Sequence, residues 1–367
     1  MSEAAAIEVD PWTIMFGRML DRFPRLFIKA GDLETRLVSE RLGGIGIHAP
    51  IHICGLARSG STILLELLAA HPDTATHRYR DFPLLHVPVG WNWFVDRAGK
   101  MDATPRERAH HDRIAITAES PEAFEEVLWM AFFDDLHDPS SSAVLGWETS
   151  CPPFEAFYRD HLRKILLLRG AGRYLAKGNY NVTRIGYLLK LFPDARFVIP
   201  VRAPADHIAS LIKQHRLFST ASEADGRVAE YLRRSGHFEF GPDRRAVNTG
   251  ASSAVPPAAK SWAQGDETAG WAHQWADVYG HVAGLLEDPI MRDAIMIVRY
   301  EDLCIDPAGT LSGILGHCAL APGDIPRRAS ETVSAPDYYR PSFEKSELAT
   351  IARITGDVAA RFGYRAR

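Results

Sequence analysis

A loop bounded by two glycines has the residue types and spacing of an anion-binding site. It runs from Gly55 to Gly60, between an apolar run and an apolar segment that opens at Ser61 or Thr62. The glycines and Thr62 stand where a phosphate-binding loop, G-x-x-x-x-G-K-[ST], has its glycines and its hydroxyl. Backbone N–H groups of such a loop, together with the following helix N-terminus, bind anions. The sequence therefore predicts a phosphate site here.

The lysine of that loop type is absent from this chain. Ser61 occupies its position, and the cation of the loop is Arg58, three residues earlier. We therefore expect the loop to hold a phosphate in a manner different from that of an ATPase.

Basic residues also follow the other candidate strands. Lys177, Arg202 and Arg299 lie at or just beyond the ends of three apolar runs. In open α/β sheets, ligands bind beyond the carboxyl ends of the strands. Several cations at one rim suit a ligand with more than one phosphate or sulfate group. A P-loop kinase normally has an Asp at a strand end for magnesium, and Arg in that place argues against metal-dependent nucleoside triphosphate chemistry.

Ser210 follows Arg202 by eight residues, on a helix that Pro204 is suited to open. A strand-end Arg and a helix Ser can jointly bind a second phosphate. A purely packing role for Ser210 is an equal alternative.

The elements that must position these residues alternate between strand and helix. The first strand and its loop are expected at 51–60, and apolar runs predict further strands at 173–177, 196–201 and 294–299. Helices are expected after each, and this order predicts a parallel sheet covered on both faces, a three-layer α/β/α fold of the P-loop type.

Two further segments have a predicted character. Residues 104–136 are expected to be helical, with Pro121 near a helix start, and residues 71–100 to be irregular. The predicted organisation is an N-terminal helical segment, 1–45, and one α/β domain, 46–367, with a mobile insertion near 220–268.

Composition limits the classes of partner and compartment. The net charge of −4 argues against bulk binding to nucleic acid or to an anionic membrane. No apolar run reaches the ~18 residues that span a bilayer, and the N-terminus lacks the layout of a signal peptide. The four cysteines have no C-x-x-C spacing, which favours free thiols in a reducing cytoplasm. A homo-oligomer is left open.

Three stretches together resemble the sulfotransferase superfamily, which uses 3′-phosphoadenosine 5′-phosphosulfate (PAPS). The loop resembles the 5′-phosphosulfate pattern P-[KR]-S-G-[ST]-T, with Ala57 in place of the Pro. Residues 192–210 resemble the 3′-phosphate motif, F-P-x-A-[KR] with a later R-x-P-x-[DE] and a Ser. Residues 298–307 resemble the segment R-Y-E-D-L with its following D-P.

The resemblance implies a role for each matched residue. Lys177 would lie near the bridging oxygen of PAPS, and Arg202 and Ser210 would bind its 3′-phosphate. It implies PAPS as co-substrate, 3′,5′-ADP as product, a small-molecule acceptor with a hydroxyl or amine, and no metal. The residues implied to hold the 5′-phosphosulfate are Arg58, Ser59, Gly60, Ser61 and Thr62.

The residue that would deprotonate the acceptor is less clearly marked. Many relatives have a His two to four residues after that Lys, whereas this chain has Asn179 and Asn181. Other branches use a carboxylate after the first helix, which makes Asp81 the leading candidate, and an ion pair with Arg78 or Arg80 is its alternative role. The lesser candidates are His77 and Glu148, and His52 is expected to be a hydrogen-bonded core residue.

The aromatic residues of the chain bear on the acceptor. They can line an apolar pocket for an aromatic or lipid-like alcohol, although such residues more often form plain core. The candidates are Trp91, Trp93, Phe94, Trp129 and Trp147. Two alternatives to a sulfotransferase are open: a P-loop kinase that uses a nucleoside triphosphate, and a nucleotide-binding protein without catalysis.

Overall fold

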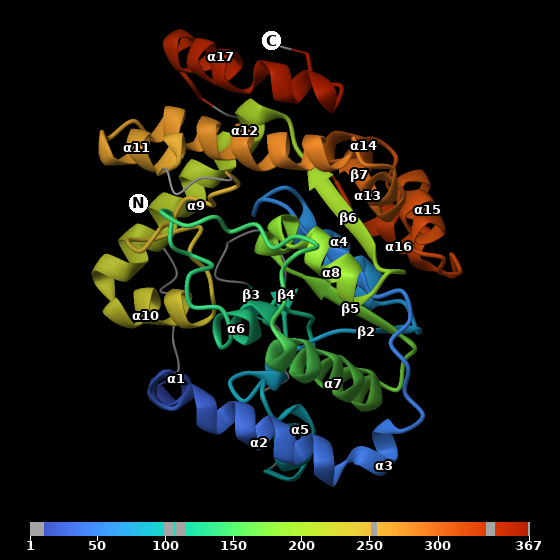
Figure 1. Ribbon diagram of the computed structural model, residues 1–367. Helices are drawn as coiled ribbons and strands as arrows, with labels where there is room; N and C mark the ends of the chain where they lie inside the picture. Colours follow the sequence, from blue (N-terminus) through green and yellow to red (C-terminus); the bar gives the residue numbers. More distant parts are fainter. Residues whose placement is uncertain (1–10, 99–105, 108–114, 251–254, 335–341, 366–367) are drawn as a thin grey trace.

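The fold is built on a parallel sheet of five strands, in the order β2-β5-β1-β6-β7. The computed structural model describes residues 11–98, 106–107, 115–250, 255–334 and 342–365 (Figure 1). The four predicted strands are all present, and the edge strand β2 was not predicted. The strands are β1 (Ile51–Ile53), β2 (Thr74–Ala75), β5 (Arg173–Lys177), β6 (Arg196–Val201) and β7 (Ile295–Arg299).

The register places the predicted phosphate loop between two strand ends. β1 is the central strand, and Ile53 pairs with Lys177 of β5 on one side and with Val198 of β6 on the other. The last ladder bonds run from Gly178 N to Ile53 O (3.0 Å) and from Cys54 N to Val198 O (3.1 Å). Lys177 and the start of the loop therefore lie at the same edge of the sheet.

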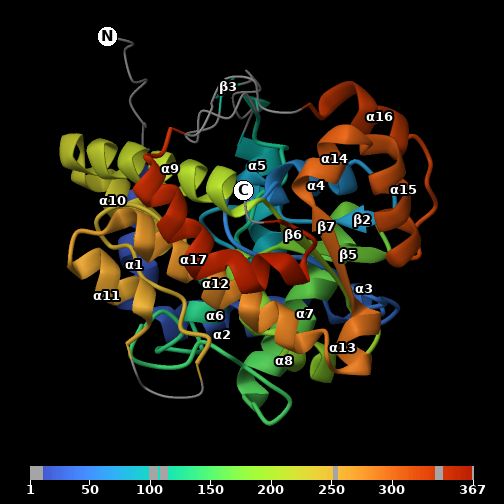
Figure 2. The same ribbon diagram turned by 90° about the horizontal axis from the view of Figure 1, so that it is seen from above.

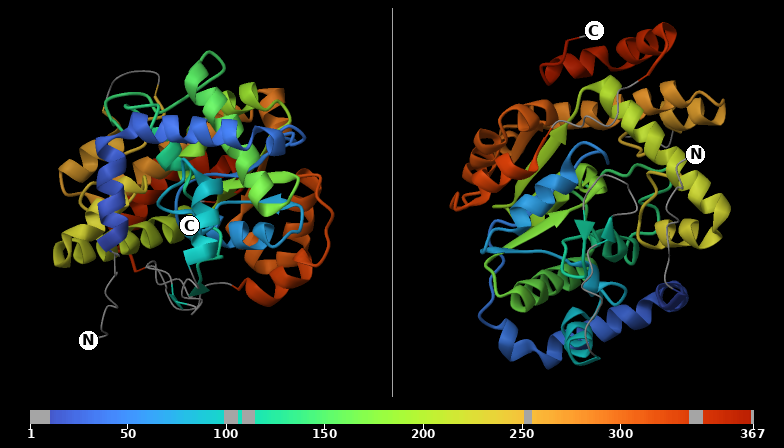
Figure 3. Two further views of the ribbon diagram at one scale, coloured as in Figure 1. Left: turned by 90° about the horizontal axis from the view of Figure 1, so that it is seen from below. Right: turned by 180° about the vertical axis from the view of Figure 1, so that it is seen from behind.

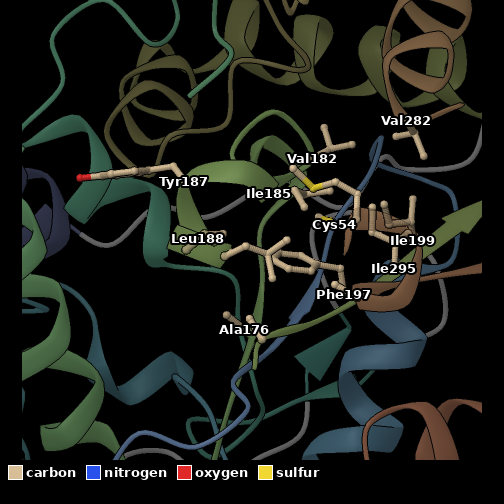
Figure 4. Packing of buried hydrophobic residues seen from close by; sticks show 14 of the residues in the cluster. Cys54, Ala176, Val182, Ile185, Tyr187, Leu188, Phe197, Ile199, Val282 and Ile295 are labelled. Atoms are coloured by element: carbon tan, nitrogen blue, oxygen red, sulfur yellow. The ribbon is translucent and has the colours of Figure 1, made fainter. Parts of the chain in front are cut away.

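Helices cover both faces of the sheet, which confirms the predicted three layers. One core cluster joins α7 (Pro152–Arg169), α8 (Ile185–Leu191) and α12 (Glu267–Leu285) to the sheet. The second cluster joins α4 (Ser61–Ala69), α15 (Pro307–His317) and α16 (Ile325–Thr332) to the opposite face. Figure 4 shows the first cluster, where Phe197 and Ile199 of β6 lie beside Cys54.

The remaining elements surround these layers. One of them, α17 (Lys345–Arg361), lies across α12 and is in contact with it (Figure 2). These elements are α1 (Pro11–Arg22), α2 (Pro24–Leu37), α3 (Ser39–Leu42), α5 (Pro88–Ala98), α6 (Glu125–Met130), α9 (Pro204–Ala224), α10 (Gly226–Arg234), α11 (Pro257–Ala263), α13 (Pro289–Ala294), α14 (Tyr300–Ile305), α17 (Lys345–Arg361), β3 (Arg106–Glu107), β4 (Ala115–Ile116) and the 3₁₀ turns η1 (Tyr79–Asp81) and η2 (Asn179–Thr183).

Helices also form much of the predicted N-terminal segment. α2 docks on α7 through a buried ion pair, Lys164 Nζ to Glu34 Oε2 at 3.2 Å. The right panel of Figure 3, seen from behind, shows α1 and α2 (blue) on the same side of the molecule as α5 (cyan). The division into a segment 1–45 and a domain 46–367 stays a prediction, and residues 1–10 lie outside the described part.

The prediction of a helix over 104–136 is wrong for the residues that the structure describes. They contain the antiparallel pair β3–β4 and a helix only at Glu125–Met130, while residues 108–114 are outside the described part. The run 123–129 is buried on all sides, so its apolar residues are not confined to one helix face. Residues 71–100, predicted to be irregular, include the regular helix α5.

The predicted insertion near 220–268 contains α10 and α11 and, between them, a segment without regular structure over 235–250. Its mobility stays a prediction, and residues 251–254 are outside the described part. None of the helices within the described ranges is long and apolar enough to cross a membrane.

Candidate functional site

The loop between β1 and α4 has an unusual backbone at three positions. Gly55 has φ +131°, Arg58 +67° and Gly60 +102°. A Cβ on Gly60 would lie 2.7 Å from Cδ2 of Tyr300, which leaves no room for any other residue. Positive φ is costly for residues with a side chain, so Arg58 is held in a strained conformation by the contacts around it. The loop is thus a fixed structure that requires its second glycine.

Contacts from other elements hold the loop in this shape. Ser59 Oγ donates to Leu56 O at 2.7 Å. His207, in the first turn of α9, donates from Nε2 to Ala57 O at 2.8 Å. Burial lowers the pKa of His207 to about 3, and the nearby Arg202 and Arg58 add to this effect. His207 is therefore a neutral donor, and no motif in the sequence pointed to this role.

The structure brings together three of the predicted anion-binding side chains. Arg58 Nε lies 3.4 Å from Ser210 Oγ, and Arg202 Nη1 lies 3.4 Å from Arg58 O. The guanidinium of Arg202 also stacks on the ring of Tyr300, 4.9 Å from its centroid. Two guanidinium groups, from the loop after β1 and from the residue after β6, thus converge with a hydroxyl of α9. Their combined charge and donors are suited to a ligand with two anionic groups.

Lys177 ends β5 at the same sheet edge. Side chains alternate along a strand, and Leu175 belongs to the core cluster beneath α4. Lys177 therefore extends toward the sheet face on which α4 begins, and its side chain is buried. This position is next to the loop, as the resemblance implies.

Arg299, the fourth strand-end cation, is used differently. Its guanidinium stacks on Tyr364 at 4.6 Å and lies 3.9 Å from Asp302. The Tyr364 hydroxyl donates to Glu301 at 2.6 Å, and Glu301 accepts from Ala203 N at 2.9 Å. The segment after β7 therefore fixes the start of α9, and Arg299 lies outside the cluster of Arg58, Arg202 and Ser210.

Asp81 is buried within a set of donors. It accepts from Arg169 Nη2 at 2.7 and 2.5 Å, from Arg78 N at 2.8 Å and from Asn92 Nδ2 at 2.9 Å. Burial alone would raise the pKa of Asp81, but the charge of Arg169 and the other donors outweigh it and lower the pKa. The ion-pair partner is thus Arg169 of α7, and neither Arg78 nor Arg80 pairs with it through its side chain. These contacts favour a structural role for Asp81, and its role as the base stays a prediction.

The lesser candidates for the base lie in other settings. His77 is buried and bonded to His161, with 2.8 Å between their Nε2 atoms. Glu148 is exposed. His52 is buried as expected, but its ring nitrogens have no hydrogen-bond partner in the described part of the chain, so that part of its prediction is wrong. Its ring stacks on Phe197 at 5.4 Å.

Two asparagines stand where relatives have a His, and each donates a hydrogen bond to a carboxylate. Asn179 Nδ2 donates to Glu239 at 2.5 Å, and Asn181 Nδ2 donates to Glu125 at 3.0 Å. Glu125 also accepts from the hydroxyls of two tyrosines, at 2.5 and 2.7 Å. Sequence reasoning missed both acids, because their partners are remote along the chain.

The predicted aromatic pocket is not assembled. Trp129 is fully buried in the core, 4.3 Å from the ring of Phe154. Trp91 stacks on Phe94 along α5, and Trp93 and Trp147 are exposed. Within the described ranges, no group of three or more His, Cys, Asp or Glu side chains could hold a metal ion.

The sequence matches the family model described as "Sulfotransferase family" over residues 50–239, more than half of the chain. This span includes the loop, Lys177, Arg202 and Ser210. No curated protein matches the sequence.

Solved structures with a similar arrangement include bacterial sulfotransferases. STF1 from Mycobacterium tuberculosis is 19% identical with a TM-score of 0.48, and the match covers 98% of this chain and 88% of that one. STF9 from Mycobacterium avium is 15% identical with a TM-score of 0.48, covering 96% and 87%. A sulfotransferase from Alicyclobacillus acidocaldarius is 13% identical with a TM-score of 0.41, covering 86% and 94%. On the match of the family model, the chain belongs to the sulfotransferase family.

Proposed function

We propose that this sulfotransferase takes its sulfuryl group from PAPS and transfers it to a hydroxyl, or an amine, of a small-molecule acceptor. The observation that supports this donor is the convergence of Arg58, Arg202 and Ser210. An anion site made by a loop and a helix N-terminus suits the 5′-phosphosulfate. A second site, made by a strand-end Arg and a helix hydroxyl, suits a 3′-phosphate, which ATP lacks.

The residues of the site would act mainly by positioning and by charge stabilisation. In the reaction, the acceptor oxygen forms a bond to sulfur while the bond from sulfur to the phosphate oxygen breaks, and 3′,5′-ADP leaves. Arg58 and the N–H groups of residues 59–62 would stabilise the charge that develops on the leaving phosphate. Lys177, at the neighbouring strand end, would donate to the oxygen that leaves with it.

The compartment is part of the same proposal. All four cysteines are free, and two of them, Cys54 and Cys318, are buried. Free thiols suit a reducing compartment, which supports a cytoplasmic enzyme.

Calorimetric titration tests the proposed donor. We expect 3′,5′-ADP to bind more tightly than ATP with magnesium, because only the former presents a phosphate to Arg202. Arg202→Ala should weaken 3′,5′-ADP binding by roughly 10- to 100-fold, since a hydrogen bond to a charged group contributes about 1.5–3 kcal/mol.

Arg196→Ala is the matched control. Arg196 lies at the opposite end of the same strand and pairs with Asp293 at 2.8 Å, so its removal should leave the binding of 3′,5′-ADP unchanged. Tighter binding of ATP with magnesium would contradict the proposal and favour a kinase. Binding of 3′,5′-ADP with no transfer of labelled sulfate to any of a panel of phenols and alcohols would favour a protein without catalysis.

A further inference from the structure

Asn179 stands two residues after Lys177, where the family resemblance implies a catalytic His. Its side chain is hydrogen-bonded to a carboxylate from another segment. Asn179 Nδ2 donates to Oε1 of Glu239 at 2.5 Å, which joins the end of β5 to the segment that follows α10. The carboxylate of Glu239 therefore lies directly beside the position from which relatives deprotonate the acceptor.

The other oxygen of Glu239 faces a histidine. His237 Nδ1 lies 3.5 Å from Glu239 Oε2. This oxygen is buried and makes no hydrogen bond within the described part of the chain. The side chain of Glu239 is 10% exposed and that of His237 is 22% exposed, so the imidazole is the more accessible of the two. Hydrogen bonds between catalytic groups are often long before the substrate binds, and this separation fits that behaviour.

The segment that carries the pair is fixed on η2. Phe238 N donates to the hydroxyl of Tyr180 at 3.1 Å, and Arg245 N donates to Phe238 O at 2.8 Å. The ring of Phe238 packs on His137 at 4.4 Å. Gly236 has φ +77°, and a Cβ there would lie 2.4 Å from Cγ of Glu126. These contacts, and the bond from Asn179 to Glu239, hold the pair beside the carboxyl end of β5.

We propose that His237 is the general base of the transfer, oriented by Glu239, which Asn179 in turn holds. This inference rests on the proposed sulfotransferase reaction. Once the acceptor is bound, Oε2 of Glu239 would accept the Nδ1–H of His237, which leaves Nε2 as the basic nitrogen. Nε2 takes the proton of the acceptor hydroxyl as the oxygen bonds to sulfur. The bond from sulfur to the phosphate oxygen breaks, and its electron pair leaves with 3′,5′-ADP.

The electrostatic setting of Glu239 agrees with this division of roles. Burial would raise the pKa of Glu239, but the interactions with His237 and Asn179 outweigh it and lower the pKa. An ionised carboxylate of low basicity is suited to stabilise an imidazolium and is a poor proton acceptor itself. The other titratable or charged groups that pack against the segment 236–239 are Tyr180, Glu126, His137 and Arg245.

The first test compares two acceptors, benzyl alcohol and para-nitrophenol, with PAPS as donor. We expect His237→Asn to lower kcat for benzyl alcohol by roughly 10²- to 10⁴-fold, the usual contribution of a general base. The loss with para-nitrophenol should be much smaller at a pH where this phenol is ionised, because no proton remains to be removed. The affinity for 3′,5′-ADP should not change. His48→Asn, at an exposed position remote from the site, is the matched control and should behave as the wild type.

Two further variants separate a base from a structural residue. Glu239→Gln should lower kcat for benzyl alcohol and have a much smaller effect with ionised para-nitrophenol, because the imidazolium that forms loses its carboxylate. Asn179→His, added to His237→Asn, should restore part of the activity toward benzyl alcohol. If His237→Asn does not fold, the comparison of Glu239→Gln with the wild type on the two acceptors decides the matter.

The outcomes distinguish this inference from the proposed function. Absence of sulfate transfer by the wild type would overturn the proposed function itself. Full turnover in His237→Asn, equal losses with both acceptors, or full turnover of benzyl alcohol by Glu239→Gln would overturn only the assignment of His237.

Discussion

Arg58 and Asp81 show how differently two charged side chains of one chain can be used. Arg58 lies beside Ser210 and Arg202 in the phosphate loop, and we propose that its charge binds a ligand there. Asp81 is also charged and buried, but its oxygens accept from three residues, Arg169 foremost. At the scale of the residue, partners therefore determine whether a charge serves binding or stability.

Removal of the Asp81 carboxylate should destabilise the protein. Asp81→Ala leaves the guanidinium of Arg169 buried without its partner, and we expect the free energy of unfolding to fall by about 3–5 kcal/mol. Urea denaturation measures this change. The surface variant Asp96→Ala removes the exposed partner of Arg80 and should change stability by at most ~1 kcal/mol.

The same experiment decides between two roles for Asp81. A structural role predicts unchanged turnover per folded molecule in a variant that still folds, such as Asp81→Asn. A drop in turnover with unchanged stability would return Asp81 to the catalytic machinery.

Between elements, the shape of the predicted phosphate loop depends on contacts with α9 and α14. His207 of α9 bonds to the loop backbone, and Tyr300 of α14 lies against Gly60. Neither helix is near the loop in sequence. The loop is therefore pre-shaped by the assembled sheet and its covering helices, and is not an autonomous motif.

Gly60→Ala should reduce both stability and 3′,5′-ADP binding. The new methyl group would lie 2.7 Å from the Tyr300 ring, at a φ of +102° that residues with a Cβ avoid. Gly170→Ala is the matched control, since Gly170 also has positive φ, +65°, but no atom within 4 Å of the added Cβ. We expect Gly170→Ala to lower stability by about 1 kcal/mol without affecting binding. Equal effects of the two variants would show that the contact with Tyr300 is unimportant.

The elements also show what the sequence could and could not reveal. Four of the five strands and the loop were predictable, because a short apolar run followed by Gly, Arg or Lys is a local signal. The pairing of Asn179 with Glu239 spans 60 positions and has no local signal. Helix α6 was misjudged because Phe124 and Leu128 are buried within a run that is buried throughout, so no single apolar face marks where the helix begins.

Across the whole molecule, buried titratable groups couple stability to pH. Burial lowers the pKa of His86 to about 4 from 6.5, aided slightly by Lys164. Burial would raise the pKa of Glu126, but Arg184 and His137 outweigh it and lower the pKa to about 2 from 4.5. The folded protein thus binds fewer protons than the unfolded chain at acidic pH.

The melting temperature should therefore fall as the pH falls. When folding lowers the pKa of a His, the unfolded chain takes up a proton at a pH where the folded protein does not. For His86 the folded protein therefore loses stability below about pH 6.5. The contribution of Glu126 is complete above about pH 4.5 and is lost toward pH 2. His86→Phe keeps the packing between Phe27 and Phe157 and should reduce the loss by about 1.4 kcal/mol per pH unit between 6.5 and 4. An unchanged pH slope in His86→Phe would contradict this account.

The central position of β1 has a consequence for synthesis on the ribosome. Ile51–Ile53 and the apolar helix α4 leave the ribosome early, but their sheet partners begin only at Arg173 and Arg196. Leu64, Leu65 and Leu68 are fully buried in the finished protein and have no sheet to cover them while the intervening chain is translated. We expect the nascent chain to expose an aggregation-prone apolar segment for that interval, and to depend on chaperones that shield apolar surface.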